Sequence, residues 1–599
     1  MVPVGGIPLL ERLVISCRDQ GIDTFYFSVH HLHEQIRHHF GDGSAFSVCI
    51  KYLEESSPMG SAGILHRLEN HCTGTTLVLN ADVLAEIDWQ KMAAFHADKK
   101  ADITLLVHPN DHPHDSDLVV MDKEDKVTAL HSKPHPTSLV ARNCVNAGAY
   151  LLEPLCFSLI PKDIPSDFGK DLFPKWCQEL SMFGYSTPEY IKDMGTPERL
   201  KEGEEALLSG RVQNRSLHLA QKAIFLDRDG VINEDTDLIH RVEDFHLFPW
   251  TASALRRINK SDYLSIVVTN QSAVARGLVD EEGLNVIHSH MDTRLGKEGA
   301  FVDALYYCPH HPHGGFPGEV MALKKDCACR KPKPGMLLQA ADRFRIDFSD
   351  SWMVGDSERD VLAGRAAGVT TVGVRTGHGS KNKEAMPEFL FDHLGEAVDY
   401  ILDQPFARIE NEFMQRWAKK TTEEPFVISI GGQARSGKST LAAALARKAR
   451  RSGIECTLIS LDHWIRAEKD RTTEEKPWDA YPYDTLRKNL EDFLIYRKEM
   501  TAPGYALHPN ESALPHTFRS APLLIIEGVV ALSLPFLRDS SHWTLAVETS
   551  VEKRKKRFLS FMDWRNRPEE TESLWQNRLQ EEVPAIEKGL IFAETHLTT

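Results

Sequence analysis

The chain has no long apolar run and no excess of basic residues, and both absences limit what it can do. No stretch is long and apolar enough to cross a bilayer, and the first residues lack the charged and then apolar pattern of an export signal. We therefore expect a cytoplasmic protein without a membrane partner. A net charge of −16 argues against general nucleic-acid binding, which needs a basic surface.

Cysteine is also scarce, with ten residues in 599, and most of them lie far apart. This argues against a disulfide framework and favours a reducing compartment. Only Cys308, Cys327 and Cys329 cluster, which points to one metal site. The length allows three or four domains, each large enough for its own core.

Three apolar stretches between residues 220 and 403 each end in side chains suited to phosphate chemistry. Asp227 and Asp229 follow the first stretch. Thr269 ends the second, and Asp356 follows the third. In parallel α/β sheets, ligands bind beyond the carboxyl ends of the strands. The pattern therefore predicts a Mg²⁺-dependent phosphoryl-transfer site.

A second pattern in the same region is typical of a structural zinc site. Its candidate ligands are three thiols and one imidazole, from Cys308, His310, Cys327 and Cys329. Two close pairs joined by a loop suit tetrahedral Zn²⁺. His311 and His313 are alternative nitrogen ligands, although the Cys-x-His spacing favours His310. Four protein ligands leave no open position, so we expect this zinc to order the loop that leads into Arg330-Lys331-Pro332.

The order Asp-x-Asp, Thr, Lys, Gly-Asp resembles the haloacid-dehalogenase (HAD) phosphatase superfamily over this whole region. The resemblance implies that Asp227 attacks phosphorus and that Asp229 is the general acid and then the base. It also implies that Thr269 and Lys331 bind the phosphoryl oxygens. Asp356 would hold Mg²⁺ with Asp227 and the Asp229 backbone.

The zinc loop narrows the resemblance to the heptose 1,7-bisphosphate phosphatases, which remove the 7-phosphate and leave the anomeric one. The motifs Cys-Pro-His-His-Pro and Cys-x-Cys-Arg-Lys-Pro carry this likeness. Histidinol-phosphate phosphatases are close relatives with the same loop. The resemblance assigns substrate positioning to Arg330, and Asp360 is a candidate for support of the metal site.

Residues 1–219 alternate between strand-like and helix-like patterns, which predicts a mainly parallel α/β sheet. Asp82 follows a predicted strand at 75–80, where a lone acid is commonly a turn or cap residue. Five motifs nevertheless stand in the order of the sugar-1-phosphate nucleotidyltransferases, which the region resembles. They are Pro-Val-Gly-Gly at 3–6, Gly-Ser-Ala-Gly at 60–63, Asn-Ala-Asp at 80–82, Val-Asn-Ala-Gly at 145–148 and Asp-Met-Gly-Thr-Pro at 193–197.

This second resemblance implies that Asp82 and Asp193 hold Mg²⁺. Gly60 and Gly63 would let the backbone approach the nucleotide base, and Lys133 would contact the sugar phosphate. The family also carries a Gly-rich, Arg-containing loop before the Pro-Val-Gly-Gly run, and this sequence does not show one. Binding of sugar phosphate without efficient transfer is therefore kept as an alternative.

The last region begins with a polar helical linker at 404–425 and a strand at 426–430. A G-x-x-x-x-G-K-S sequence follows and leads into an Ala/Leu-rich helix, which is the context of a phosphate-binding loop. The residues expected to bind ATP and its Mg²⁺ are Gly432, Gly437, Lys438, Ser439 and Thr440. Of these, Lys438 would bridge the β and γ phosphates, and Ser439 would bind Mg²⁺.

Downstream, two apolar strands end in Asp462 and Glu527, an order that resembles the uridine kinase and phosphoribulokinase group. That resemblance implies that Asp462 orients the acceptor hydroxyl and that Glu527 lies near Mg²⁺. Arginines at 554, 557, 565 and 567 are either lid residues or a solvated basic helix face. Further candidates for acceptor contacts are Tyr481, His508 and Arg519.

Together the patterns predict three consecutive α/β domains at 1–219, 220–403 and 426–599, joined in the last case by the linker at 404–425. A nucleotidyltransferase, a phosphatase and a kinase on one chain suggest successive steps of nucleotide-activated heptose synthesis. The expected substrates are phosphorylated heptoses and nucleoside triphosphates. Alternatives are another phosphorylated sugar or a histidinol-phosphate-like substrate, or a sugar-nucleotide-binding scaffold or sensor.

Overall fold

The structure is a computed structural model that describes residues 2–136, 138–380, 385–466, 480–504, 515–565, 567, 569 and 571–599. The contacts divide the chain into two compact units, one reaching from the N-terminus to Thr371 and the other from Met386 to the C-terminus. Of the described residues between them, 376–378 and 385 belong to the first unit, and 372–375 and 379–380 to the second. No helix in the described part of the chain has the length and apolar character needed to span a bilayer.

The first unit begins with a mixed sheet in the order β11-β7-β10-β8-β9, with β5 also paired to β10. Its strands are β5 (Thr76–Leu79), β7 (Ile103–His108), β8 (Leu118–Met121), β9 (Val127–His131), β10 (Val145–Leu152) and β11 (Met182–Ser186). Only the β11–β7 pair is parallel, because β10 runs antiparallel to β5, β7 and β8. The expectation of a mainly parallel sheet is therefore wrong for this region, although strand and helix still alternate.

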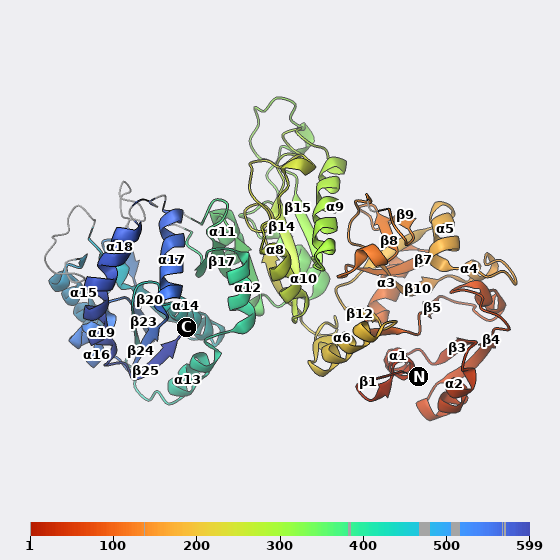
Figure 1. Cartoon of the computed structure of the whole chain (residues 1–599), viewed down its shortest axis with the longest axis horizontal. Helices are drawn as coiled ribbons and strands as arrows, with labels where there is room; N and C mark the ends of the chain where they lie inside the picture. Colours follow the sequence, from red (N-terminus) through yellow and green to blue (C-terminus); the bar gives the residue numbers. More distant parts are fainter. Residues whose placement is uncertain are drawn as a thin grey trace. The chain divides into compact units, whose positions relative to one another are not determined.

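Three two-stranded sheets and the α-helices α1 to α7 belong to the described part of this region (Figure 1). The paired strands are β1 (Pro3–Val4) with β2 (Ile7–Pro8), β3 (Thr24–Val29) with β4 (Cys49–Glu54), and β6 (Val83–Glu86) with β12 (Tyr190–Asp193). The helices are α1 (Leu9–Asp19), α2 (His33–Phe40), α3 (Trp89–Lys99), α4 (Pro154–Ser158), α5 (Phe173–Glu179), α6 (Pro197–Leu208) and α7 (Arg211–Asn214). The β6–β12 pairing sets Val83 opposite Asp193, which brings Asp82 near Asp193.

The next sheet has the order β15-β14-β13-β16-β17-β18, and the boundary between the two units falls within β17. Its strands are β13 (Lys222–Leu226), β14 (Tyr263–Asn270), β15 (Ala304–Cys308), β16 (Trp352–Gly355), β17 (Thr370–Val374) and β18 (Phe389–Phe391). The pairs of β13 with β14 and β16, and of β14 with β15, are parallel. The central strand β13 is apolar and almost wholly buried, as expected for a strand covered on both faces.

Helices α8 (Thr251–Asn259), α9 (Glu281–Lys297), α10 (Gly335–Phe344), α11 (Glu358–Ala367) and α12 (Leu394–Asp403) accompany this sheet. Asp280 caps α9 by accepting the Gly283 N–H, and Ser357 and Asp360 form a capping box on α11. These caps fix where each helix begins relative to its strand. The core packs β13, β14 and β16 residues against α10, including Phe225, Ile266 and Leu337.

The second unit holds a parallel sheet in the order β20-β23-β19-β24-β25. Its strands are β19 (Phe426–Gly432), β20 (Cys456–Ser460), β23 (Leu523–Glu527), β24 (Trp543–Glu548) and β25 (Thr595–Thr598), with β21 (Met500–Ala502) and β22 (His516–Phe518) paired separately. The helices are α13 (Ala407–Ala418), α14 (Lys438–Arg451), α15 (Tyr483–Tyr496), α16 (Pro535–Asp539), α17 (Val551–Trp564), α18 (Thr571–Asn577) and α19 (Val583–Leu590). The proposed linker contains α13, whose Ile409 and Phe413 are buried.

Candidate active site and metal centre

The acids predicted at the strand ends of the HAD-like region do lie at one edge of the sheet. Strand β13 pairs Leu226 with Val354 of β16 and with Val267 of β14, so the residues that follow emerge side by side. Carboxylate oxygens of Asp227, Asp356 and Asp360 lie within 4.8 Å of one another. Such a set of hard oxygen ligands fits a Mg²⁺ ion.

Lys331 is the counter-charge of this acid cluster. Its ammonium lies 2.8 Å from Asp227 Oδ2 and 2.6 Å from Asp360 Oδ1, and its side chain is only 1% exposed. Asn270 holds the Lys331 backbone by donating to its carbonyl at 3.0 Å and accepting its N–H at 3.1 Å. Lys331, which is 104 positions away from Asp227 in sequence, is thus fixed beside it.

The acids remain crowded despite that lysine. Burial raises the pKa of Asp227 to about 7, and the pKa of Asp356 to about 8 with the help of Asp360 and Asp227. Crowded buried carboxylates of this kind favour a divalent cation, which relieves their repulsion. Two glycines make the approach possible: a Cβ at Gly230 or Gly377 would lie 2.4 or 2.1 Å from Asp356 Oδ2.

Asp229 points to a different set of partners. Arg228 grips its carboxylate in a fork, with Nε 2.8 Å from Oδ1 and Nη2 2.9 Å from Oδ2. Asn233 and Gln271 donate to the same two oxygens at 3.0 and 2.9 Å. Burial alone would raise the pKa of Asp229, but the charge and hydrogen bonds of Arg228, with those of Asn233 and Gln271, bring it below its usual value. The side chain of Asp229 therefore stands apart from the acid cluster.

Thr269 is almost wholly buried, and its hydroxyl accepts the Gln271 amide at 2.9 Å. Asn270 and Gln271 were not among the predicted site residues, although they directly follow Thr269 at a strand end. Their position directly after Thr269 was the sequence feature from which they could have been predicted. Arg330 donates from Nη1 to the His310 carbonyl at 3.0 Å, so it also ties the zinc loop to this edge.

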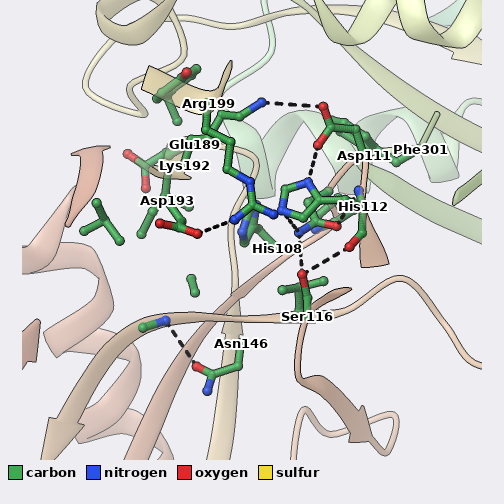
Figure 2. Close-up of a pocket in the computed structure, with 18 of the residues that line it drawn as sticks. His108, Asp111, His112, Ser116, Asn146, Glu189, Lys192, Asp193, Arg199 and Phe301 are labelled. Atoms are coloured by element: carbon green, nitrogen blue, oxygen red, sulfur yellow. Dashed lines mark hydrogen bonds and ion pairs between the residues drawn. The ribbon is translucent and has the colours of Figure 1, made fainter. Parts of the chain in front are cut away.

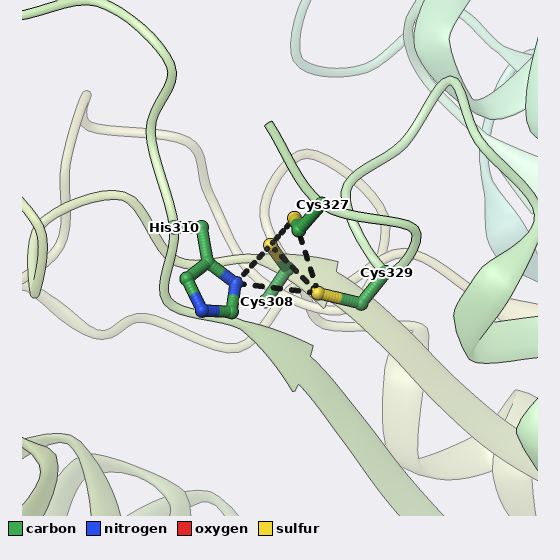
Figure 3. Close-up of side chains that lie close together, drawn as sticks. All are labelled: Cys308, His310, Cys327 and Cys329. Carbon is green, nitrogen blue, oxygen red and sulfur yellow. Dashed lines mark hydrogen bonds between the residues drawn. The ribbon is translucent and has the colours of Figure 1, made fainter. Parts of the chain in front are cut away.

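The four predicted zinc ligands converge (Figure 3). The sulfur–sulfur distances are 3.6 Å for Cys308–Cys327 and 3.3 Å for both Cys308–Cys329 and Cys327–Cys329. His310 Nδ1 lies 3.6 and 3.4 Å from the Cys308 and Cys329 sulfurs. Tetrahedral zinc with Zn–S bonds of about 2.3 Å has ligand-to-ligand edges of about 3.8 Å. The donor set therefore fits Zn²⁺, with His310 rather than His311 or His313 as the nitrogen donor.

A cavity with a volume of about 570 Å³ contains Asp82, Lys133 and Asp193 in its lining. Burial raises the pKa of Asp82, and the nearby Asp193 adds to the shift. Arg199 forms an ion pair with Asp193 (Figure 2). It forms a second ion pair with Asp115 at 3.1 Å. The two predicted metal ligands, Asp82 and Asp193, thus lie close together, and the Arg199 guanidinium is paired with Asp193.

The other residues predicted for this cavity lie differently. Lys133 donates to the Asp115 carbonyl at 3.1 Å. Gly60 and Gly63 are not part of the lining, and a Cβ at Gly60 would lie 2.5 Å from the Ser166 carbonyl oxygen. These two glycines allow a close approach of two loops. His108, Asp111, His112 and Lys192 line the cavity and were not predicted.

In the second unit, the Gly-rich sequence forms the turn between β19 and α14, with Gly437 in a left-handed conformation directly before the helix. Lys438 is buried, and its ammonium donates to the Gln433 carbonyl at 3.2 Å. Gly432 ends β19, while Ser439 and Thr440 fall in the first turn of α14. Burial raises the pKa of Glu527, with Asp462 adding to the shift.

Asp462 accepts the Tyr481 hydroxyl at 3.4 Å. Among the arginines, Arg554 is buried and Arg557 donates to the Arg435 carbonyl at 3.2 Å. Arg519 pairs with Glu499 at the surface at 2.8 Å. His508 lies outside the described residues.

Two family models match separate parts of the chain. The one described as nucleotidyl transferase matches residues 1–210, and the one described as HAD-hydrolase-like matches residues 328–397. With the acids and lysine at the sheet edge, these matches define the class: an enzyme that combines a nucleotidyltransferase region with a HAD-type phosphatase region.

Curated relatives give a more specific family for the HAD-type region. The D-glycero-beta-D-manno-heptose-1,7-bisphosphate 7-phosphatase of Vibrio cholerae is 40% identical over 186 residues, or 31% of this chain and 98% of the relative. That of Escherichia coli K12 is 44% identical over 182 residues, or 30% and 88%. A crystal structure of D,D-heptose 1,7-bisphosphate phosphatase from B. bronchiseptica, complexed with magnesium and phosphate, is 36% identical with a TM-score of 0.28 and covers 31% of this chain and 99% of that one. Through this part, the chain belongs to the D-glycero-beta-D-manno-heptose-1,7-bisphosphate 7-phosphatase family.

Proposed function

We propose that the chain is a multifunctional enzyme of nucleotide-activated heptose synthesis, and that its HAD-type region removes the 7-phosphate of heptose 1,7-bisphosphate. The observation that carries this proposal is the placement of Lys331. It lies two residues after the zinc-loop cysteine Cys329 and contacts both Asp227 and Asp360. The substrate is taken from the relatives, whose names state that bisphosphate.

The reaction uses the two acids of the first strand end in different ways. The Asp227 carboxylate attacks phosphorus, and the bond from phosphorus to the C7 oxygen breaks. Because Asp229 is a carboxylate before the substrate binds, it first takes a proton from the singly protonated 7-phosphate and passes that proton to the C7 oxygen as the bond breaks. Asp229, again a carboxylate, then takes a proton from water as the water oxygen attacks the aspartyl-phosphate. Inorganic phosphate leaves and Asp227 is regenerated.

Lys331 lies where it can neutralise phosphoryl oxygens beside the nucleophile, and Thr269 borders the same edge. The residues that would hold Mg²⁺ are Asp227, Asp356 and the Asp229 backbone carbonyl, with Asp360 in support. When bound, the ion supplies positive charge against the phosphate. Zn²⁺ would be held by Cys308, His310, Cys327 and Cys329 and would order the loop that carries Arg330 and Lys331.

Replacing the nucleophile tests this assignment. Asp227→Asn should abolish phosphate release while leaving the other activities of the full chain intact. The control is Asp237→Asn, at an exposed aspartate in the same region. Retention of phosphate release by Asp227→Asn would contradict the aspartyl-phosphate mechanism. A panel of histidinol phosphate and other sugar bisphosphates separates the heptose assignment from its alternatives.

For the first region we propose transfer of a nucleotidyl group from a nucleoside triphosphate to a sugar 1-phosphate, with Asp82 and Asp193 as the candidate Mg²⁺ ligands. The ion pair of Arg199 with Asp193 favours a second candidate, which is binding of the sugar nucleotide without transfer. Pyrophosphate release with CTP, GTP or ATP and a sugar 1-phosphate distinguishes the two. Binding without release supports the scaffold or sensor.

For the second unit we propose ATP-dependent phosphorylation of a sugar or related small molecule. The turn of Gly432 to Lys438 at the start of α14 is the supporting observation, since helix N-termini bind phosphates. Asp462 would orient the acceptor hydroxyl, and Glu527 and Ser439 would serve the Mg²⁺ of ATP. Lys438→Ala should abolish ADP formation with heptose 7-phosphate as acceptor, and unchanged ADP formation would contradict the proposal.

A further inference from the structure

The residue between the two catalytic acids, Arg228, is a fully buried cation. Its side chain is 0% exposed, and its Nε and Nη2 form the fork that holds Asp229. Removing a guanidinium from water costs several kcal/mol unless its other donors are also satisfied. The position of Asp229 therefore depends on what holds the far side of Arg228.

Two neutral acceptors hold that far side. Gln271 Oε1 accepts from Arg228 Nη2 at 3.0 Å, and His288 Nε2 lies 3.2 Å from Arg228 Nη1. Burial, with the charges of Arg228 and Arg142, holds the pKa of His288 well below its usual value. The ring is therefore neutral, so Nε2 can accept the Arg228 hydrogen bond. Gln271 also donates directly to Asp229 and to Thr269, so a substitution there would disturb several contacts at once. His288 therefore offers the cleaner test, because we expect it to act on Asp229 only through Arg228.

The position of His288 is fixed by the packing of its ring and by contacts of helix α9, which carries it. It is 1% exposed, and its ring packs on Tyr307 with centroids 5.6 Å apart. One turn later, Asp292 accepts from Arg142 Nε at 2.6 Å and from the Asn143 N–H at 3.2 Å.

A second contact fixes the C-terminal part of α9. A Cβ at Gly296 would lie 2.5 Å from Pro113 Cγ, so glycine permits a close approach there. Residues of the nucleotidyltransferase region thus contact the later turns of helix α9, whereas His288 on an earlier turn of the same helix contacts Arg228.

We propose that His288 is a positioning residue of the phosphatase: by accepting the Arg228 Nη1 hydrogen bond, it holds the guanidinium in the orientation that aims the Asp229 carboxylate. This inference rests on the proposed function of Asp227 and Asp229. Without the acceptor, one Arg228 donor is buried and unsatisfied, so the guanidinium turns toward another partner and the fork on Asp229 loosens. Both steps that use Asp229 then slow, whereas substrate binding does not.

The test compares His288→Leu, which removes the acceptor, with His288→Gln, whose amide oxygen can take the place of Nε2. Asn285→Leu, at an exposed position of the same helix, is the control. For phosphate release from heptose 1,7-bisphosphate we expect His288→Leu to lower kcat by about 10- to 100-fold, because misplacing a catalytic group by about 1 Å costs up to roughly 100-fold. KM should change less than about twofold, and His288→Gln should recover most of kcat.

A second substrate separates positioning from mere destabilisation. The leaving group of p-nitrophenyl phosphate needs no proton, so Asp227 is still phosphorylated rapidly in His288→Leu, while the slowed water attack lets the aspartyl-phosphate accumulate. We expect a burst of nitrophenol in that variant and a smaller one or none in the wild type. If His288→Leu does not fold, His288→Met, a flexible side chain with only a weak acceptor, takes its place.

The outcomes are distinct. Unchanged kcat in His288→Leu, an equal loss in His288→Gln, or a loss without a burst would overturn the positioning role. A wild-type chain that releases no phosphate would instead refute the proposed function on which the role depends.

Discussion

Removing one zinc ligand should disable the phosphatase by releasing the loop that positions Lys331. Of residues 309–326 only His311 is buried, so the loop gains little from apolar burial. Ordering a backbone costs about 1–2 kcal/mol per residue, whereas zinc binding in small structural sites contributes roughly 10–16 kcal/mol. We therefore expect the ligand set, rather than packing, to order this loop. Cys327→Ser replaces a thiolate with a hydroxyl that is not ionised at neutral pH and is a poor zinc ligand.

The effect reaches catalysis because the loop ends at Cys329 and Lys331 follows two residues later. A displacement of about 1 Å at Lys331 would lower kcat by up to roughly 100-fold. The assay is zinc content by mass spectrometry together with phosphate release, and Cys49→Ser, at an exposed cysteine of the first region, is the control. We expect about one zinc per wild-type chain and only a small fraction in Cys327→Ser. Zinc-free wild-type protein with full activity, or full activity in zinc-depleted Cys327→Ser, would refute this reasoning.

Two further predictions follow from buried contacts of the same region. Gly230→Ala adds a methyl 2.4 Å from Asp356 Oδ2 at a residue with φ of +81°, so it should displace Asp356 and weaken the Mg²⁺ dependence of phosphate release; an unchanged Mg²⁺ titration would contradict the proposed ion site. Burial and the charge of Arg228 hold the pKa of His288 well below 6.5 in the folded chain. As the pH falls, His288 therefore takes up a proton in the unfolded chain before it does so in the folded chain. The free energy of unfolding should then decrease below a pH of about 6.5, by up to about 1.4 kcal/mol per pH unit. His288→Gln should lose less stability than the wild type between pH 7 and 5 in thermal unfolding, and parallel losses would contradict a neutral buried His288.

Much of the phosphatase site could be predicted from the sequence, because strand ends and close Cys/His pairs are local patterns. Asp227, Asp356 and the zinc cluster need only a parallel sheet and one loop to come together. The mixed pairing of β10 could not be predicted in this way, since an apolar run does not encode the direction of its neighbour. The comparisons confirm the nucleotidyltransferase and phosphatase resemblances, while the kinase resemblance and the domain boundaries stay predictions.

The partners of the acids were harder to foresee than the acids. Arg228 received no predicted role within the Asp-x-Asp pattern, and its contact with His288 joins residues 60 positions apart in sequence. Arg199 lies six residues after Asp193, yet only the turn from β12 into α6 brings the two together. Ion pairs of this kind depend on tertiary contacts, which single-sequence patterns do not report.

The position of phosphate removal is the most direct test of the proposed function. Phosphorus NMR of the full chain with Mg²⁺ and heptose 1,7-bisphosphate follows both phosphates in one sample. We predict loss of the C7 phosphate signal, growth of inorganic phosphate and persistence of the anomeric phosphate. Loss of the anomeric phosphate first, or no inorganic phosphate at all, would contradict the assignment.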